Sequence, residues 1–362
     1  MDIAKIDKNM KIESKIAEAD IAFYDVRNKP FEVYGLYDYQ NQAEFKRLPD
    51  DIAKATSEGV FYLYRNTAGG RVRFCTDSRY VAIHAEMPSV GHMDHMAMTG
   101  SSAFDLYLDD PDSEETVFYN SFRPSFGFND GYESKVTFPD RRLRYITINF
   151  PSYSHVTNLY IGLQEDAKLD AGMKYKDMLP VVYYGSSITQ GGCSSRPGNA
   201  YQNVISQRMN IDFINLGFSG NGKGEDVIVD YMATLNMSAF VSDYDHNAPT
   251  PEHLRNTHYK LYQKIRAAHP DIPYIMITRP NFRTNPDSER RRDVVVDSFR
   301  MAREAGDTNV YYIDGESFFR GPYANMCTVD GCHPTDVGFA LMADSIGYEL
   351  KEALFHKYRR WN

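Results

Sequence analysis

The second half of the chain alternates between short apolar runs and longer segments with helical periodicity. Five apolar runs occur after residue 163, and in the segments between and after them apolar residues recur every three to four positions. This alternation predicts a parallel sheet with helices on both faces, because parallel strands need long crossover connections. The runs span 179–184, 212–216, 238–242, 273–278 and 310–314, and the helical segments span 200–209, 225–235, 251–268, 288–305 and 335–354.

The first half has a different pattern, in which apolar and polar residues alternate along short segments. Many short strands separated by turn sequences predict a β-sandwich. A polar, charged connection at 164–177 separates the two patterns. We therefore expect an all-β domain at 1–170 and an α/β domain at 171–362. The segments with a period of two are 61–65, 71–74, 80–84, 104–108 and 145–150.

Composition excludes several classes of partner. A formal net charge of −9 argues against nucleic acid, since phosphate binding needs a basic field. The N-terminus has no uninterrupted apolar core, and no stretch approaches the roughly 20 apolar residues of a membrane span. We therefore expect no membrane partner and a cytoplasmic protein, with secretion as the alternative if a leader has been removed. The sequence leaves a homo-oligomer open.

Small residues end the first apolar run of the second half, at Gly185-Ser186-Ser187. Open α/β sheets place their chemistry at the carboxyl ends of strands. Ser186 and Ser187 are therefore both candidates for a nucleophile. The alternative is a turn and a serine that caps the next helix.

A nucleophilic serine needs a base, and the base needs a partner that sets its tautomer. His333 lies in the loop after the fifth apolar run, which should emerge at the same sheet edge as the serines. Asp330 precedes it by three residues in a loop that contains Gly331 and Pro334, close enough to accept a hydrogen bond from the imidazole. The alternative is a loop histidine beside a turn-forming aspartate.

Two further loops can supply donors for an oxyanion. The loop 217–222 contains Gly220, whose backbone N–H can approach a substrate because no side chain is in the way. The segment 243–247 ends in Asn247, whose side-chain amide can donate. All these segments follow predicted strands, so their side chains should meet at one edge of the sheet.

The order Ser, Gly, Asn, His over about residues 178–355 resembles the SGNH superfamily of GDSL-type esterases and acylhydrolases. The resemblance implies a flavodoxin-like three-layer α/β/α fold with five parallel strands, and it selects the second serine. No metal and no organic cofactor are implied. The residues implied are Ser187, His333 and Asp330 as a catalytic triad, and the amides of Ser187 and Gly220 with the Asn247 side chain as an oxyanion hole.

The chain departs from the family pattern in two of these blocks. Ser186 replaces the Asp of Gly-Asp-Ser, which is not the triad acid. Asp245 and Ala248 replace the Gly and Asp that flank the third-block Asn, so Asn247 is the assignment with the least support from the motif.

A second resemblance lies in the first half. Ala103-Phe-Asp105-Leu106-Tyr107 is similar to the G-x-D-L-Y motif of the β-sandwich that precedes some of these esterases, with Ala in place of Gly. It implies a jelly-roll-like accessory domain. The string 186–198 is similar to a subgroup of bacterial carbohydrate esterases. This likeness implies removal of an acyl group, above all acetyl, from a decorated sugar or oligosaccharide.

Three other groups of residues are candidates for substrate binding, disulfide formation or metal binding. Arg196 and Arg279 lie beside predicted strand ends, where each could bind a substrate oxygen or form a surface salt bridge. Cys193 and Cys332 stand near the predicted nucleophile and base, as a pair or as free thiols. The segment 92–95 contains two histidines and an aspartate, but without a third ligand cluster we expect no metal site there.

The function that these observations predict is that of a serine esterase. An acyltransferase would use the same triad with a hydroxyl acceptor in place of water. A third hypothesis is an inactive carbohydrate-binding protein that retains the fold.

Overall fold

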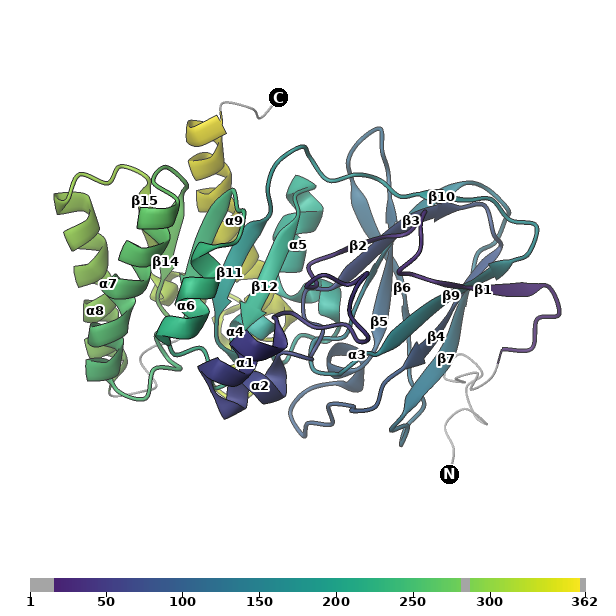
Figure 1. Ribbon diagram of the computed structural model, residues 1–362, viewed down its shortest axis with the longest axis horizontal. Coiled ribbons are helices and arrows are strands. Elements are labelled where there is room, and N and C mark those ends of the chain that lie inside the picture. The colour runs from purple at the N-terminus through teal and green to yellow at the C-terminus, as the bar shows by residue number, and fades with distance from the viewer. Residues whose placement is uncertain (1–15, 281–286, 359–362) are drawn as a thin grey trace. The chain divides into compact units, whose positions relative to one another are not determined.

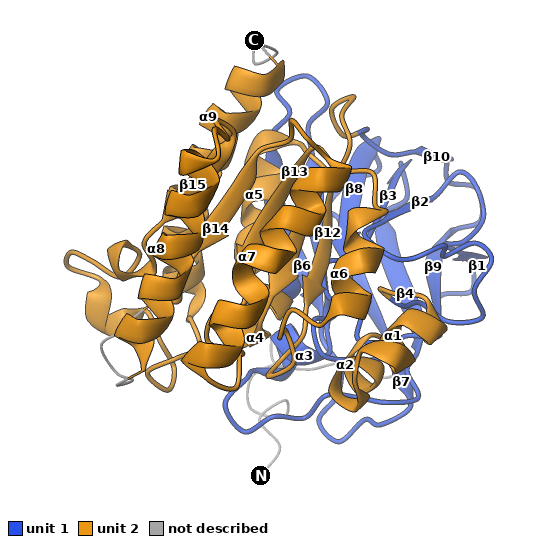
Figure 2. Ribbon diagram, turned by 60° about the vertical axis from the view of Figure 1, so that its left-hand side comes forward, with its two compact units in different colours: residues 1–46, 65–174, 195–198 blue, residues 47–64, 175–194, 199–362 orange. Residues whose placement is uncertain are grey.

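The computed structural model describes residues 16–280 and 287–358, which form two compact units (Figure 1). Figure 2 distinguishes the units by colour. The main division falls between Lys174 and Tyr175, near the boundary expected at 170, but two short segments group differently. Unit 1 consists of the residues up to Lys46, Arg65–Lys174 and Ser195–Gly198, and unit 2 of Arg47–Tyr64, Tyr175–Ser194 and the residues from Asn199 onward.

A five-stranded parallel sheet forms the centre of unit 2. Its strand order is β12-β11-β13-β14-β15, which is the flavodoxin-like order 2-1-3-4-5. The expected flavodoxin-like fold is thus confirmed, and all five apolar runs of the second half are strands. The strands are β11 (Val181–Gly185), β12 (Phe213–Gly217), β13 (Ala239–Asp243), β14 (Tyr274–Ile277) and β15 (Val310–Ile313).

Helices cover both faces of this sheet, so its strands are buried on both sides and read as continuous apolar runs. On β11, Val182 and Tyr184 belong to one apolar core, and Val181 and Tyr183 belong to the other. The first core is covered by α1 (Asp50–Thr56), α2 (Glu58–Leu63), α6 (Asp226–Ala233), α7 (Pro251–Ala268) and α8 (Ser288–Glu304), and the second by α5 (Tyr201–Met209) and α9 (Asp336–Tyr358).

The strand predicted at 61–65 is wrong, because most of this segment lies in helix α2. Ser57 caps that helix, and its hydroxyl accepts the Val60 N–H at 3.2 Å. Val60 and Leu63 are both buried in the first core, and a spacing of three places them on one helical face. So short a run fits a period of two as well as a helical period, and the cap and the tertiary burial decide between them.

Arg47 ties the segment of α1 and α2 to the central sheet of unit 2. Its guanidinium is 2% exposed and donates to three backbone carbonyls, those of Leu63 at 2.8 Å, Asn215 at 3.2 Å and Gly217 at 2.5 Å. It also lies over the Phe218 ring, 4.5 Å from the ring centroid. Since buried carbonyls need donors, this one side chain satisfies groups on two segments distant in sequence.

Unit 1 is a sandwich of two antiparallel sheets, which confirms the predicted β-sandwich. One sheet has the order β1-β9-β4-β7, and the other has the order β10-β3-β8-β5-β6 with β2 also paired to β3. The remaining predicted segments of the first half lie in β3, β4, β5 and β8. Inward residues of both sheets, such as Ile83 and Ile161 from one and Phe74 and Ile148 from the other, form a single core. Unit 1 contains β1 (Ile21–Asp25), β2 (Glu32–Tyr34), β3 (Arg71–Thr76), β4 (Tyr80–Glu86), α3 (Met98–Ser101), β5 (Phe104–Asp109), β6 (Thr116–Phe122), β7 (Gly131–Thr137), β8 (Arg144–Asn149), β9 (Asn158–Gln164) and β10 (Leu169–Ala171).

In the part of the chain that the structure describes, no helix combines the length and the apolar character needed to cross a membrane.

Replacing Arg47 by Met should destabilise unit 2 by about 3 kcal/mol, because the buried carbonyls lose a charged donor. Urea denaturation followed by circular dichroism would measure the shift of the midpoint. Arg255→Met is the matched control, since the Arg255 side chain is 54% exposed and its ion pair with Asp297 is 3.8 Å long. Equal midpoints for the two variants would contradict a structural role of Arg47.

Candidate active site

Ser187 lies at the point where the order of the central sheet reverses. The chain leaves β11 for β12 on one side and later returns to β13 on the other, so their loops diverge at the carboxyl end of β11. Such a switch point is where open α/β sheets form a crevice. Ser187 is the first residue of the short helix α4 (Ser187–Gln190). Ser186 caps this helix, its hydroxyl accepting the Ile188 N–H at 3.1 Å, so the two serines have different surroundings.

The structure brings Ser187, His333 and Asp330 into one hydrogen-bonded chain. Ser187 Oγ lies 2.9 Å from His333 Nε2, and His333 Nδ1 lies 2.7 Å from Asp330 Oδ2. A carboxylate can only accept, so Nδ1 carries the hydrogen and Nε2 of the neutral ring accepts from the serine hydroxyl. This tautomer is the one that a general base needs to activate a serine.

The loop of Asp330 and His333 is held by the aspartate itself. Asp330 Oδ1 accepts the Cys332 N–H at 2.9 Å and the His333 N–H at 2.7 Å, while Gly331 between them has a φ of +84°. Burial alone would raise the pKa of Asp330, but hydrogen bonds from the His333 side chain and from the two amides outweigh it. They lower that pKa to about 2. The carboxylate therefore stays ionised at neutral pH.

Two loops at the same edge of the sheet contain the predicted oxyanion donors. Gly220 has a φ of +66°, and within the described ranges its N–H has no hydrogen-bond partner. Asn247 Oδ1 accepts the Gly222 N–H at 3.3 Å, which leaves the Nδ2 group of this amide to donate. The glycine loop packs tightly on β11, because a Cβ on Gly222 would lie 2.2 Å from the Gly185 carbonyl oxygen. The geometry thus places both loops beside the strand that leads to Ser187.

A buried polar cluster behind Asn247 was not predicted from the sequence. Asp245 accepts from His246 Nδ1 at 2.9 Å and from the Arg279 N–H at 3.1 Å. Burial raises the pKa of Asp245, but the hydrogen bond and charge of His246 outweigh this effect and the pKa is lowered. Burial and the neighbouring charge of Asp245 raise the pKa of Asp243 well above its usual value. The signal in the sequence was the segment 243–246, which contains two aspartates and a histidine at the end of the third apolar run.

Ligand atoms of Asp243, Asp245 and His246 lie within 4.8 Å of one another, so this cluster has the residue types of a cation site. Both oxygens of Asp245 already accept hydrogen bonds, and the buried cation Arg279 is close enough to shift the pKa of Asp245. A positive neighbour disfavours a second cation, so the donor set fits a hydrogen-bonded network better than a metal centre.

Arg196 pairs with a buried aspartate, Asp105, where a surface salt bridge was the alternative expected from the sequence. It belongs to unit 1, where its guanidinium lies 3.7 Å from the centroid of the Phe118 ring and hydrogen-bonds Tyr107. Its Nη1 is 3.4 Å from the fully buried carboxylate of Asp105, which also accepts the Gly198 N–H at 2.9 Å. Asp105 and Tyr107 are the D and the Y of the predicted G-x-D-L-Y motif, and both contact the segment 195–198.

The remaining candidates are placed individually. Arg279 is 7% exposed, so it too is no surface residue. Cys193 and Cys332 are both free thiols. Burial, with the charge of Asp330, raises the pKa of Cys193 to about 12, which keeps this thiol protonated and unreactive. In the segment 92–95, the His92 ring packs edge-on against Phe128.

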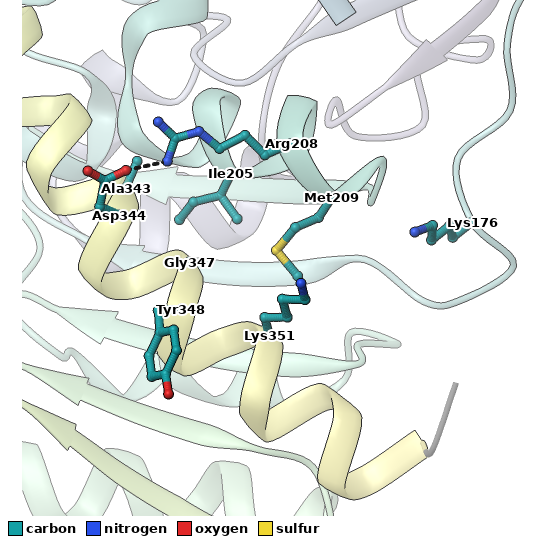
Figure 3. Close-up of a pocket in the computed structure, with 9 residues that line it drawn as sticks. All are labelled: Lys176, Ile205, Arg208, Met209, Ala343, Asp344, Gly347, Tyr348 and Lys351. Carbon is teal, nitrogen blue, oxygen red and sulfur yellow. Dashed lines mark hydrogen bonds and ion pairs between the residues drawn. The ribbon is translucent and has the colours of Figure 1, made fainter. Parts of the chain in front are cut away.

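A hollow of about 350 Å³ lies elsewhere in unit 2, between α5 and α9 (Figure 3). Lys176 and Met209 precede the starts of β11 and β12, so this hollow lies toward the amino ends of the strands, away from Ser187. Its lining residues include no serine, cysteine or histidine, so it lacks the residue types of a Ser–His pair. The lining residues are Lys176, Ile205, Arg208, Met209, Ala343, Asp344, Gly347, Tyr348 and Lys351.

Asp330→Asn should change how stability depends on pH. A pKa of about 2 in the folded state, against roughly 3.9 in an unfolded chain, means that the carboxylate stabilises the fold above pH 4 and loses this effect as the pH falls toward 2. The gap in urea midpoint between the native protein and the variant should therefore shrink between pH 5 and pH 3. A gap that stays constant over this range would contradict the predicted ionisation.

Two family models match the chain. Residues 178–351 match the GDSL-like lipase/acylhydrolase family, and residues 21–169 match the GxDLY model, described as the N-terminus of an SGNH-hydrolase-type esterase. A comparison with curated proteins gave no match.

Solved structures share the fold over nearly the whole chain. A Bacteroides ovatus protein described as a GDSL-like lipase is 25% identical, with a TM-score of 0.82, covering 92% of this chain and 98% of its own. A salicylyl-acyltransferase from a tetracycline biosynthetic pathway is 17% identical, with a TM-score of 0.73 and coverage of 93% and 98%. A family two carbohydrate esterase from Clostridium thermocellum, in complex with cellohexaose, is 13% identical, with a TM-score of 0.62 and coverage of 90% and 99%.

With both family models matched, the chain belongs to the SGNH superfamily of GDSL-type carboxylic ester hydrolases, in the two-domain form with a GxDLY N-terminal domain.

Proposed function

We propose that this protein removes acyl groups, chiefly acetyl, from hydroxyls of a carbohydrate, with Ser187 as the nucleophile. The observation that carries the proposal is the hydrogen-bonded chain from Ser187 Oγ through the His333 ring to Asp330 at the switch point of the sheet. This arrangement supplies a nucleophile, a base in the correct tautomer and an ionised partner for the imidazolium that forms.

The reaction proceeds through an acyl-enzyme. His333 Nε2 takes the hydroxyl proton as Ser187 Oγ attacks the ester carbonyl carbon, and the carbonyl oxygen becomes an oxyanion. The N–H groups of Ser187 and Gly220 and the Nδ2 group of Asn247 donate to this oxyanion. The imidazolium then protonates the departing sugar oxygen, and the ester bond to the sugar breaks. Water, deprotonated by His333, attacks the acyl-enzyme and releases the acid and free Ser187.

Asp330 acts on His333 throughout both half-reactions. It fixes the ring orientation through Nδ1 and stabilises the positive ring after proton transfer. Its low pKa keeps it ionised as the ring becomes charged, so the proton remains on His333 until the leaving group takes it.

A carbohydrate as the substrate is supported by structural neighbours. The Clostridium thermocellum carbohydrate esterase that shares the fold over 90% of this chain is in complex with cellohexaose. A second neighbour is an acetyl xylan esterase from Butyrivibrio proteoclasticus, 10% identical with a TM-score of 0.56. The sequence string 186–198, similar to that of bacterial carbohydrate esterases, supports the same class.

The salicylyl-acyltransferase among the neighbours favours a second candidate, in which an acceptor hydroxyl takes the acyl group in place of water. Measuring the ratio of free acid to acylated acceptor among the products distinguishes the esterase from the acyltransferase. Free acid as the main product, at acceptor concentrations that saturate the site, supports hydrolysis. An inactive carbohydrate-binding protein would form neither product.

Ser187→Ala should abolish release of 4-nitrophenol from 4-nitrophenyl acetate and of acetate from acetylated oligosaccharides. Ser186→Ala is the matched control, because this serine only caps α4 and its loss should cost about 1 kcal/mol of stability. A fluorophosphonate probe should label the Ser186 variant and not the Ser187 variant. Labelling or turnover in Ser187→Ala would overturn the proposal.

Asn247→Asp should lower kcat by about 10²- to 10³-fold with little change in KM, because a donor to the oxyanion becomes a negatively charged acceptor. Steady-state kinetics with 4-nitrophenyl acetate would measure both constants. Asn120→Asp, at an exposed position of unit 1, makes the same chemical change and should leave kcat unaltered. An equal effect of both substitutions would argue against Asn247 as an oxyanion donor.

A further inference from the structure

Arg279 is held rigidly at the carboxyl end of β14. Its N–H donates to Asp245 Oδ2 at 3.1 Å. Its carbonyl is packed against Gly315, since a Cβ there would lie 2.3 Å from the Arg279 oxygen. Both contacts fix the backbone from which the side chain projects.

The guanidinium of Arg279 makes no hydrogen bond to the described residues, although its charge lies close enough to Asp245 to lower the pKa of that carboxyl. The residue is 7% exposed, and its Nε is fully buried and makes no hydrogen bond. Within 16–280 and 287–358, no hydrogen bond and no ion pair within 4.0 Å from this guanidinium occurs. Arg291, 6% exposed in the same unit, also has an unpaired Nε, but its Nη1 donates to the carbonyls of Asp245 at 2.7 Å and Ala248 at 2.6 Å.

Burying a cation whose side chain makes no hydrogen bond costs folding free energy. A ligand that binds the cation would offset this cost. Asp245 is close enough for the Arg279 charge to lower its pKa, but its oxygens accept from the His246 ring and from the Arg279 backbone. The five donors of a guanidinium match the two oxygens of a carboxylate in a bidentate pair. A carboxylate of a bound ligand could accept hydrogen bonds from the guanidinium of Arg279.

The position of Arg279 places it on the reacting side of the sheet. It follows β14, and the strands on either side, β13 and β15, lead to the segment of Asn247 and to the loop of His333. Its charge is among the influences on the pKa of Cys332, the residue directly before His333. An anion bound here would lie at the same edge of the sheet as the loops of Asn247 and His333.

We propose that Arg279 binds a carboxylate of the substrate, and that the protein prefers acylated carbohydrates that contain a uronic acid. This inference rests on the proposed esterase function and adds the class of substrate to it. A carboxylate on the acyl group, as in a half-ester of a dicarboxylic acid, would use the same guanidinium, so the test must separate the two sources.

The test compares matched ester pairs on the native protein, Arg279→Gln and Arg279→Lys. One pair is an acetylated methyl glucuronoside and its neutral glucuronamide, and the other is the 4-nitrophenyl half-ester of succinic acid and 4-nitrophenyl butyrate. The native protein should favour the charged member in kcat/KM by about 10- to 100-fold. Arg279→Gln should lose the ratio, and Arg279→Lys should keep part of it as a point charge.

The pair that shows the preference identifies the source of the carboxylate. Arg208→Gln is the matched control, because Arg208 is paired with Asp344 at 2.5 Å and lines the hollow between α5 and α9. This variant should keep the native ratio. Equal rates for charged and neutral members in the native protein, or an unchanged ratio in Arg279→Gln, would overturn the proposal.

Binding without turnover separates this inference from the proposed function. In the Ser187→Ala background, calorimetric titration with methyl glucuronoside should detect binding that the added Arg279→Gln substitution weakens by about 10-fold or more. If this binding occurs while the native protein, with Ser187 intact, hydrolyses none of the esters, the esterase proposal is wrong and the carboxylate site still stands. Equal binding by both variants would sink the carboxylate site alone.

Discussion

The parallel pairing of β11 with both β12 and β13 is the constraint on which the site depends. The register places Gly185 opposite Gly217 and opposite Asp243, so three loops leave the sheet at the same level. The chain continues from β11 in one direction and comes back on the other side, which opens the crevice where Ser187 begins α4. A slip of one residue would move Val182 and Tyr184 from one apolar core to the other, so burial on both faces protects this register.

Polar contacts, more than apolar packing, then give the loops their shape. Asp330 accepts two amides of its own loop, Asn247 accepts an amide of the glycine loop, and Asp245 accepts the amide of Arg279. Each contact satisfies backbone groups that would be costly to bury alone. The same contacts hold the side-chain donors before substrate arrives, and donors that are already oriented stabilise a developing charge without reorganisation. Arg279 is the exception, because its backbone is satisfied and its guanidinium is not.

Much of the α/β half could be predicted because its local and global signals agree. The helix α7 runs over the predicted residues, since Thr250 caps its start and Pro251 fits the first turn. The strand prediction for 61–65 is wrong because its apolar spacing fits both a strand period and a helical period. Only the Ser57 cap and burial in the first core of unit 2 favour a helix. Arg196 shows a different limit: the structure packs this residue on Phe118 of β6, a contact that no local pattern encodes.

The sequence by itself determined which residues could do the chemistry and where the strands of the α/β half would lie. Small and polar residues in the loops that follow apolar runs marked Ser187, Gly220, Asn247 and His333, because strand ends are local features. Only the tertiary structure decided that Ser187 and His333, 146 residues apart, lie 2.9 Å from each other. It alone decided that the Arg291 side chain donates to two carbonyls while the Arg279 side chain donates to none of the described residues. Strand order and the surroundings of a buried charge depend on which distant segments meet, and that is a property of packing.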